Sequence, residues 1–207
     1  SEETPSAKTI LLVRDGRDTI FSQFKRERKF SDFNSMLSTG IKPFNLRPAD
    51  TWALFNLIWL NFAARKGNLF TIKFEDIKSD PETVLPKLLG YMGISRDPDT
   101  IRAAIESSSF ERAKKHEEDY RAKAIRTQFD LVNRRGQPGE WKEAYGVEQL
   151  AFFDGLPNLA LKHFGYEPSD DFDAEQLRRL LDPNQSIGKS ADFLNKALSF
   201  VKNKDGL

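Results

Sequence analysis

An apolar hexapeptide that leads through an Asp-Gly turn into a basic helical pattern constrains the fold more than any other feature of this sequence. Residues 8–13, KTILLV, have polar flanks and β-branched content, which is typical of a strand buried on both faces of a parallel sheet. Asp15-Gly16 forms the turn, and Asp18 is a candidate N-cap for a helix that runs through Phe24. This strand, turn and helix predict the first unit of an α/β fold.

Further strands and helices alternate along the chain. Residues 49–67 predict a helix whose aromatic side chains surround most of its axis, and residues 68–74, NLFTIKF, predict a second buried strand. The segments that begin at Asp80 and Asp97 each have an acidic N-cap followed by proline, which is the typical start of a helix. The alternation indicates an α/β layered fold with a mainly parallel sheet.

The C-terminal half is more polar. Residues 111–135 predict a surface helix and a mobile loop, and residues 147–168 predict an amphipathic helix that is broken at Gly155-Leu156-Pro157. Polarity rises again from Ser169 onward. We therefore expect one domain over residues 1–168 and an appended helical tail over residues 169–207.

Composition excludes several classes of function. With 39% hydrophobic and 30% charged residues in 207, the chain is of the soluble globular type, and its net charge of +1 argues against a nucleic-acid partner. It has no cysteine and two histidines, so we expect no thiolate catalysis and no metal site. No apolar stretch is long enough to span a bilayer. Targeting is not readable from a chain that begins at Ser1, and we expect a cytoplasmic protein.

Arg14 is the first candidate for binding an anion. It follows the first predicted strand, and ligands of open parallel sheets bind at the carboxyl ends of the strands. Ser22 lies about one turn into the following helix, and an arginine with a hydroxyl is a suitable receptor for a phosphate monoester. The alternative is that Arg14 pairs with a nearby carboxylate such as Asp18.

Residues 134–145, RRGQPGEWKEAY, are the second candidate. Arg134, Arg135 and Gly136 can present two guanidinium groups and an unhindered backbone N–H to one anion. A helix is expected to start at about Glu140. The alternative for such a segment is a solvated surface turn.

Four segments in this order resemble the C-terminal two-thirds of the sulfotransferases that use 3′-phosphoadenosine 5′-phosphosulfate (PAPS). They are KTILLVRDGRDTIFSQF, LFTIKFEDIKSDPETVLPKLLGYMGI, SSSFERAKK and RRGQPGEWKEAY. The resemblance implies a three-layer fold like that of P-loop NTPases. It also implies roles for eight residues: the 3′-phosphate ligands Arg14, Ser22, Arg134, Arg135 and Gly136, and the adenine-side residues Phe74, Ser108 and Phe110.

Departures from the family pattern have different consequences. Arg135 replaces a lysine and preserves the charge, whereas Phe74 replaces a tyrosine and keeps only the stacking surface. Glu75 and Asp76 are expected to be structural acids rather than catalysts. The phosphosulfate loop and the histidine base of the family lie upstream of the matched segments, so the catalytic residues are unknown and we expect no sulfuryl transfer by residues 1–207 alone. An N-terminal segment or a second chain would complete the fold.

The resemblance implies an enzyme that transfers a sulfuryl group from PAPS to a hydroxyl or amine and releases adenosine 3′,5′-bisphosphate (PAP), with no metal. The apolar character of residues 30–48 favours a small-molecule or lipid-like acceptor. Two alternatives stay open at this point. One is a non-catalytic nucleotide-binding or interaction module on the same fold, and the other is a nucleoside-type kinase.

Overall fold

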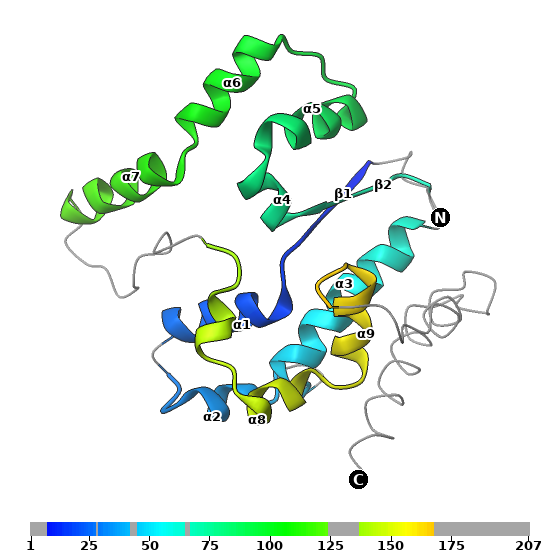
Figure 1. Ribbon diagram of the computed structural model, residues 1–207, viewed down its shortest axis with the longest axis vertical. Helices are drawn as coiled ribbons and strands as arrows, with labels where there is room; N and C mark the ends of the chain where they lie inside the picture. Colours follow the sequence, from blue (N-terminus) through cyan, green and yellow to red (C-terminus); the bar gives the residue numbers. More distant parts are fainter. Residues whose placement is uncertain (1–7, 28, 42–44, 65–66, 124–136, 168–207) are drawn as a thin grey trace, which may run out of the picture.

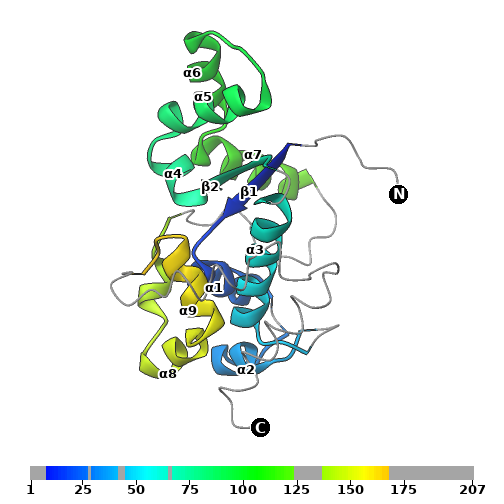
Figure 2. The same cartoon turned by 90° about the vertical axis from the view of Figure 1, so that its right-hand side faces the viewer.

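The computed structural model describes residues 8–27, 29–41, 45–64, 67–123 and 137–167. Two parallel strands lie between the helices of residues 74–123, drawn in green, and the remaining described helices (Figures 1 and 2). The elements in chain order are β1 (Thr9–Val13), α1 (Gly16–Arg26), α2 (Phe33–Ser38), α3 (Pro48–Ala64), β2 (Leu69–Lys73), α4 (Phe74–Ser79), α5 (Pro81–Met92), α6 (Pro98–Ser107), α7 (Phe110–Lys123), η1 (Glu140–Glu143), α8 (Val147–Leu150), η2 (Ala151–Phe153) and α9 (Leu156–His163).

β1 and β2 pair in parallel, with Thr9 opposite Leu69 and Val13 opposite Lys73. The two predicted strands and their parallel arrangement are therefore confirmed. The expectation that the first strand is buried on both faces is wrong. Successive side chains of a strand point to opposite faces: Leu11 and Val13 are buried on the face toward the core, whereas Leu12 on the other face is 55% exposed.

α1 begins three residues earlier than the sequence suggested. Asp15, and not Asp18, is the N-cap, and its carboxylate accepts a hydrogen bond from the backbone N–H of Arg17. Gly16 follows immediately and lies under the indole of Trp52, where an added Cβ would be 2.5 Å from a ring carbon. The close approach of α1 to α3 thus requires a residue without a side chain at position 16.

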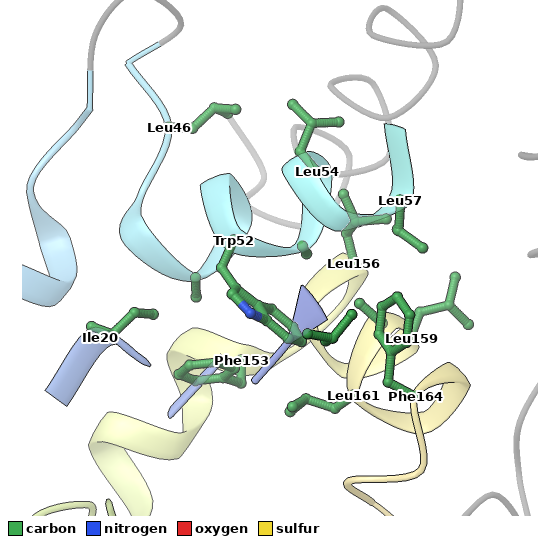
Figure 3. Close-up of a cluster of buried hydrophobic side chains, with 14 of the residues drawn as sticks. Ile20, Leu46, Trp52, Leu54, Leu57, Phe153, Leu156, Leu159, Leu161 and Phe164 are labelled. Carbon is green, nitrogen blue, oxygen red and sulfur yellow. The ribbon is translucent and has the colours of Figure 1, made fainter. Parts of the chain in front are cut away.

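The main core lies between α3 and α9. Trp52, Leu57, Leu156 and Leu159 from these two helices converge with the buried face of β1 (Figure 3). Burial of α3 is uneven among the residues whose burial is described, which corrects the expectation that a helix with aromatic residues around most of its axis is largely buried. Phe55 and Trp59 are 58% and 41% exposed, because no described element covers the side of α3 that faces away from the sheet and α9.

α5 begins and ends where its local sequence predicts. Asp80 is its N-cap, Pro81 occupies the first turn, and Gly93 ends the helix in the left-handed conformation. Pro86 lies within the helix and does not divide it. The hydroxyl of Tyr91 anchors α5 to the starts of both strands, since it accepts from the Thr9 N–H at 3.1 Å and donates to the Asn68 carbonyl.

The last predicted helix is divided, as its glycine and proline suggested. α8 and η2 precede Gly155, which has φ +77°, and α9 starts at Leu156. The predicted helix near Glu140 is the short 3₁₀ segment η1. Residues 168–207 lie outside the described residues, so the helical tail stays a prediction.

Candidate functional site

The two strand ends place Arg14 beside Phe74. Val13 and Lys73 are paired in register, so the next residue of each strand lies at the same carboxyl edge of the sheet. The guanidinium carbon of Arg14 is 4.8 Å from the centre of the Phe74 ring, within the range of a cation–π contact. The ammonium group of Lys78 lies 6.0 Å from the same ring. This edge therefore carries positive charge next to an aromatic surface.

Arg14 makes no ion pair with any described residue, which argues against the carboxylate alternative. Its side chain is half-buried, and its Nε atom is buried without a hydrogen-bond partner in the described part of the chain. Its backbone carbonyl accepts a hydrogen bond from the Trp52 indole at 3.1 Å. The backbone of Arg14 is thus fixed on α3, while its side chain has no hydrogen bond with the described residues.

The neighbouring arginine, Arg17, has a structural role. Its guanidinium is buried, pairs with the Asp15 carboxylate at 2.7 Å and with Glu167, and lies 3.8 Å from the Trp141 ring centre. Burial alone would lower the pKa of Arg17, but the hydrogen bond and charge of Asp15, with those of Glu167, raise it above its ordinary value. Arg17 therefore stays charged and pairs with the carboxylate of Asp15, the residue that directly follows Arg14.

Asp18 joins α1 to the segment that follows residues 134–136. Its buried carboxylate accepts hydrogen bonds from the backbone N–H groups of Gly139 at 2.6 Å and Trp141 at 2.9 Å. Burial raises the pKa of Asp18, and the hydrogen bonds from Gly139 and Trp141 oppose that rise. The sequence pattern around Asp18 predicts a helix cap and gives no sign of this role, because the two N–H groups come from a distant segment.

Ser22 lies on the same face of α1 as Asp18 and Lys25, which contact η1 and the residue before it. It lies four residues after Asp18 and three before Lys25, and both spacings place side chains on one side of a helix. Lys25 pairs with Glu140 at 3.0 Å. The half-buried Ser22 is therefore on the side of α1 that faces residues 139–141.

Glu75 connects the strand ends to the C-terminal part of the domain. Its carboxylate accepts hydrogen bonds from the Asp15 N–H at 3.2 Å and from the Tyr166 hydroxyl at 2.7 Å. Burial and the hydrogen bond to Glu75 raise the pKa of Tyr166. These contacts support a structural role for Glu75.

Of the other predicted site residues, only Ser108 has a described side chain, and it makes no described contact with Arg14. Ser108 is the C-cap of α6 and is exposed, and Phe110 opens α7. No hydrogen bond or ring contact between described side chains links Ser108 to Arg14 or Phe74. Arg134, Arg135 and Gly136 lie outside the described residues.

The described residues contain neither a metal-binding cluster nor a membrane-spanning helix. No group of three or more His, Asp or Glu side chains is arranged to hold a metal ion. No described helix has both the length and the apolar character needed to cross a bilayer.

Comparisons with known proteins identify relatives of the chain. Mouse sulfotransferase 2A6 is 27% identical over 158 residues, which are 72% of this chain and 54% of that protein. The 3-beta-hydroxysteroid sulfotransferase of Cavia porcellus is 26% identical over 176 residues, or 78% of this chain and 58% of that protein. The chain thus spans little more than half the length of these curated relatives.

Solved structures share the fold. Retinol dehydratase in complex with retinol and PAP superposes with a TM-score of 0.56 at 22% sequence identity, covering 80% of this chain and 48% of that one. A mouse sulfotransferase complexed with PAP gives a TM-score of 0.54 at 21% identity, covering 72% and 56%. The expected P-loop-like sulfotransferase fold is confirmed.

The family model described as "Sulfotransferase domain" matches residues 1–165 of the 207-residue chain. Together with the parallel strand pair and its cationic carboxyl edge, this match shows that the chain belongs to the sulfotransferase family.

Proposed function

We propose that this chain supplies the 3′-phosphate and adenine side of a PAPS site in an enzyme that transfers a sulfuryl group to a hydroxyl or amine. The observation that carries the proposal is the guanidinium of Arg14, which lies at the carboxyl edge of two parallel strands without an acidic partner among the described residues. A half-buried cation in this position favours an anionic ligand.

The proposed 3′-phosphate ligands are Arg14, Ser22, Arg134, Arg135 and Gly136. The described contacts support the grouping of the first two with the segment after the other three. Asp18 and Lys25, which flank Ser22 on α1, both hold residues of that segment. Ser108, Phe110 and Phe74 are proposed on the adenine side.

The phosphate ligands bind the nucleotide without driving the chemical step. The 3′-phosphate is present in both donor and product, so contacts to it stabilise ground state and transition state alike. Stabilisation of the departing 5′-phosphosulfate oxygen and deprotonation of the acceptor need other groups. No metal ion has a role in this proposal.

We also propose a small, mainly apolar hydroxyl compound as the acceptor. Support comes from the retinol and androsterone present in solved retinol dehydratase complexes, which share the fold of this chain, and from the hydroxysteroid activity in the name of a relative. A cytoplasmic location stays an expectation from the sequence.

Titration calorimetry with PAP and with adenosine 5′-monophosphate (AMP) tests the assignment of Arg14. Removing a charged hydrogen-bond partner of a phosphate costs about 1.5–3 kcal/mol, so Arg14→Ala should bind PAP at least about tenfold more weakly than the unmodified protein. Arg96→Ala is the charge-matched control, because that exposed arginine hydrogen-bonds only the Ser95 carbonyl among the described residues. Equal affinity of the unmodified protein for PAP and AMP would refute the proposal.

A further inference from the structure

The guanidinium of Arg14 has a cation–π contact with the Phe74 ring and no hydrogen bond or ion pair with the described side chains. The carboxylates around this arginine have other partners: Asp15 binds Arg17, Glu75 binds the Asp15 N–H and the Tyr166 hydroxyl, and Asp18 binds the N–H groups of Gly139 and Trp141. The charge of Asp18 acts on Arg14 through space only. The direction of the Arg14 side chain therefore depends on an aromatic surface rather than on an acid.

The geometry of such a contact keeps the donors of the arginine available. A guanidinium is planar, and its five N–H bonds point outward in that plane. A ring in a cation–π contact occupies a face of the group and removes no donor. A carboxylate in the same place would bind the N–H fork itself and compete with an anionic ligand.

Holding the side chain in advance also favours binding. An arginine side chain has about 2 kcal/mol of rotamer entropy in its free form, and part of this is lost whenever a ligand orders it. A contact that restricts the side chain before binding reduces that loss. The paired register of Val13 and Lys73 keeps the ring and the guanidinium opposite each other.

We propose that Phe74 is a positioning residue, which holds the guanidinium of Arg14 for the 3′-phosphate of the nucleotide. This inference rests on the proposed function and deepens it. It adds to the proposed place of Phe74 on the adenine side an effect on the 3′-phosphate through Arg14. Because the contact needs only a ring face, phenylalanine and tyrosine serve equally well at this position.

The experiment compares PAP and AMP binding to Phe74→Leu and Phe74→Tyr. Loss of the ring should weaken PAP binding by about three- to thirtyfold, the range expected for a partly desolvated cation–π contact. AMP lacks the 3′-phosphate, so its affinity should change by less than about twofold. Phe74→Tyr should retain the PAP affinity of the unmodified protein. Should Phe74→Leu fail to fold in a thermal unfolding control, Phe74→Met removes the ring with a smaller change in shape.

A double-mutant cycle with Arg14→Ala separates the direct and indirect roles of the ring. If Phe74 acts through Arg14, Phe74→Leu has no further effect on PAP affinity once Arg14 is alanine. Equal weakening of PAP and AMP, or an unchanged loss in the Arg14→Ala background, would show that the ring acts on the base and would overturn the inference. Failure of the unmodified protein to prefer PAP to AMP would instead refute the proposed function.

Discussion

At the scale of single residues, two arginines three positions apart have opposite environments. Arg17 is 3% exposed and fully partnered by Asp15 and Glu167, whereas Arg14 is half-buried with no acidic partner among the described residues. Both follow the same strand, and the sequence pattern alone does not distinguish them. The difference gives Arg17 a structural role and supports the proposal that Arg14 binds the nucleotide.

Replacing Arg17 with methionine should strongly destabilise the protein. The substitution leaves the buried carboxylate of Asp15 without its cation, and breaking a buried pair in this way typically costs about 3–5 kcal/mol. Arg102→Met is the matched control, since Arg102 and its partner Asp99 have side chains that are 58% and 86% exposed. Such surface pairs contribute roughly 0–1 kcal/mol. Urea unfolding measures both, and similar small losses would contradict the structural role of Arg17.

At the scale of elements, a single buried carboxylate fixes η1 and its N-terminal flank against α1. Asp18 accepts hydrogen bonds from two backbone N–H groups, those of Gly139 and Trp141, which are 121 and 123 positions further along the chain. Lys25 and Glu140 add an ion pair at the other end of the same helix face. The segment after the Arg-Arg-Gly sequence is thereby held next to Ser22.

The titration of Asp18 should make the free energy of unfolding depend on pH. Burial raises its folded-state pKa above 3.8, so between that value and the folded pKa the native state binds more protons than the unfolded state. The contribution of Asp18 to the free energy of unfolding is therefore full below pH 3.8 and declines as pH rises through the folded pKa. We expect the stability of the unmodified protein relative to Asp18→Asn to fall with pH across this window.

Glu27→Gln supplies a control of opposite sign for this measurement. Hydrogen bonds from Lys29 and Gln23 lower the pKa of Glu27, so its contribution is present above the unfolded pKa and is lost as pH falls through the folded value. Urea unfolding from about pH 3 to pH 7 covers both windows. A relative stability that rises with pH for Asp18 would mean that its two N–H bonds outweigh its burial.

At the scale of the whole molecule, the core and the cationic edge are built from the same elements. α3 and α9 bury the face of β1 that carries Leu11 and Val13, and the Trp52 indole at the centre of this packing also binds the Arg14 carbonyl. The position of the candidate site thus depends on the core beneath it. The opposite face of β1, with Ile10 and Leu12, is exposed in the described structure.

Truncation of a buried and of an exposed leucine should lower the free energy of unfolding by different amounts. Leu57 on α3 is fully buried, so Leu57→Ala should lower the free energy of unfolding by about 2–5 kcal/mol through lost packing and a residual cavity. Leu12 is 55% exposed, and Leu12→Ala should cost less than about 1 kcal/mol. Thermal and urea unfolding give both values. Equal costs would mean that Leu12 is buried in solution as completely as Leu57.

The part of the candidate site that could be predicted from sequence depends on the strand ends. An arginine directly after a short apolar strand lies at the carboxyl edge of a parallel sheet, whatever the rest of the chain does, so Arg14 and its neighbour across the register, Phe74, were predictable. The contact between them follows from pairing in register. The roles of Asp18 and Arg17 were not predictable, because their partners come from distant segments.

The sequence by itself determined the features that depend on neighbours along the chain. These are the two strands, the N-caps Asp80 and Asp97, and the break before α9 at Gly155. Caps and turns are formed by hydrogen bonds and backbone angles within a few residues, so their patterns are local. Only the tertiary structure decided that α3 is unevenly buried, that Asp18 binds residues 139 and 141, and that Arg14 rather than Arg17 lacks an acidic partner among the described residues. Burial and ion pairing depend on segments that are far apart in the chain and meet only in the folded state.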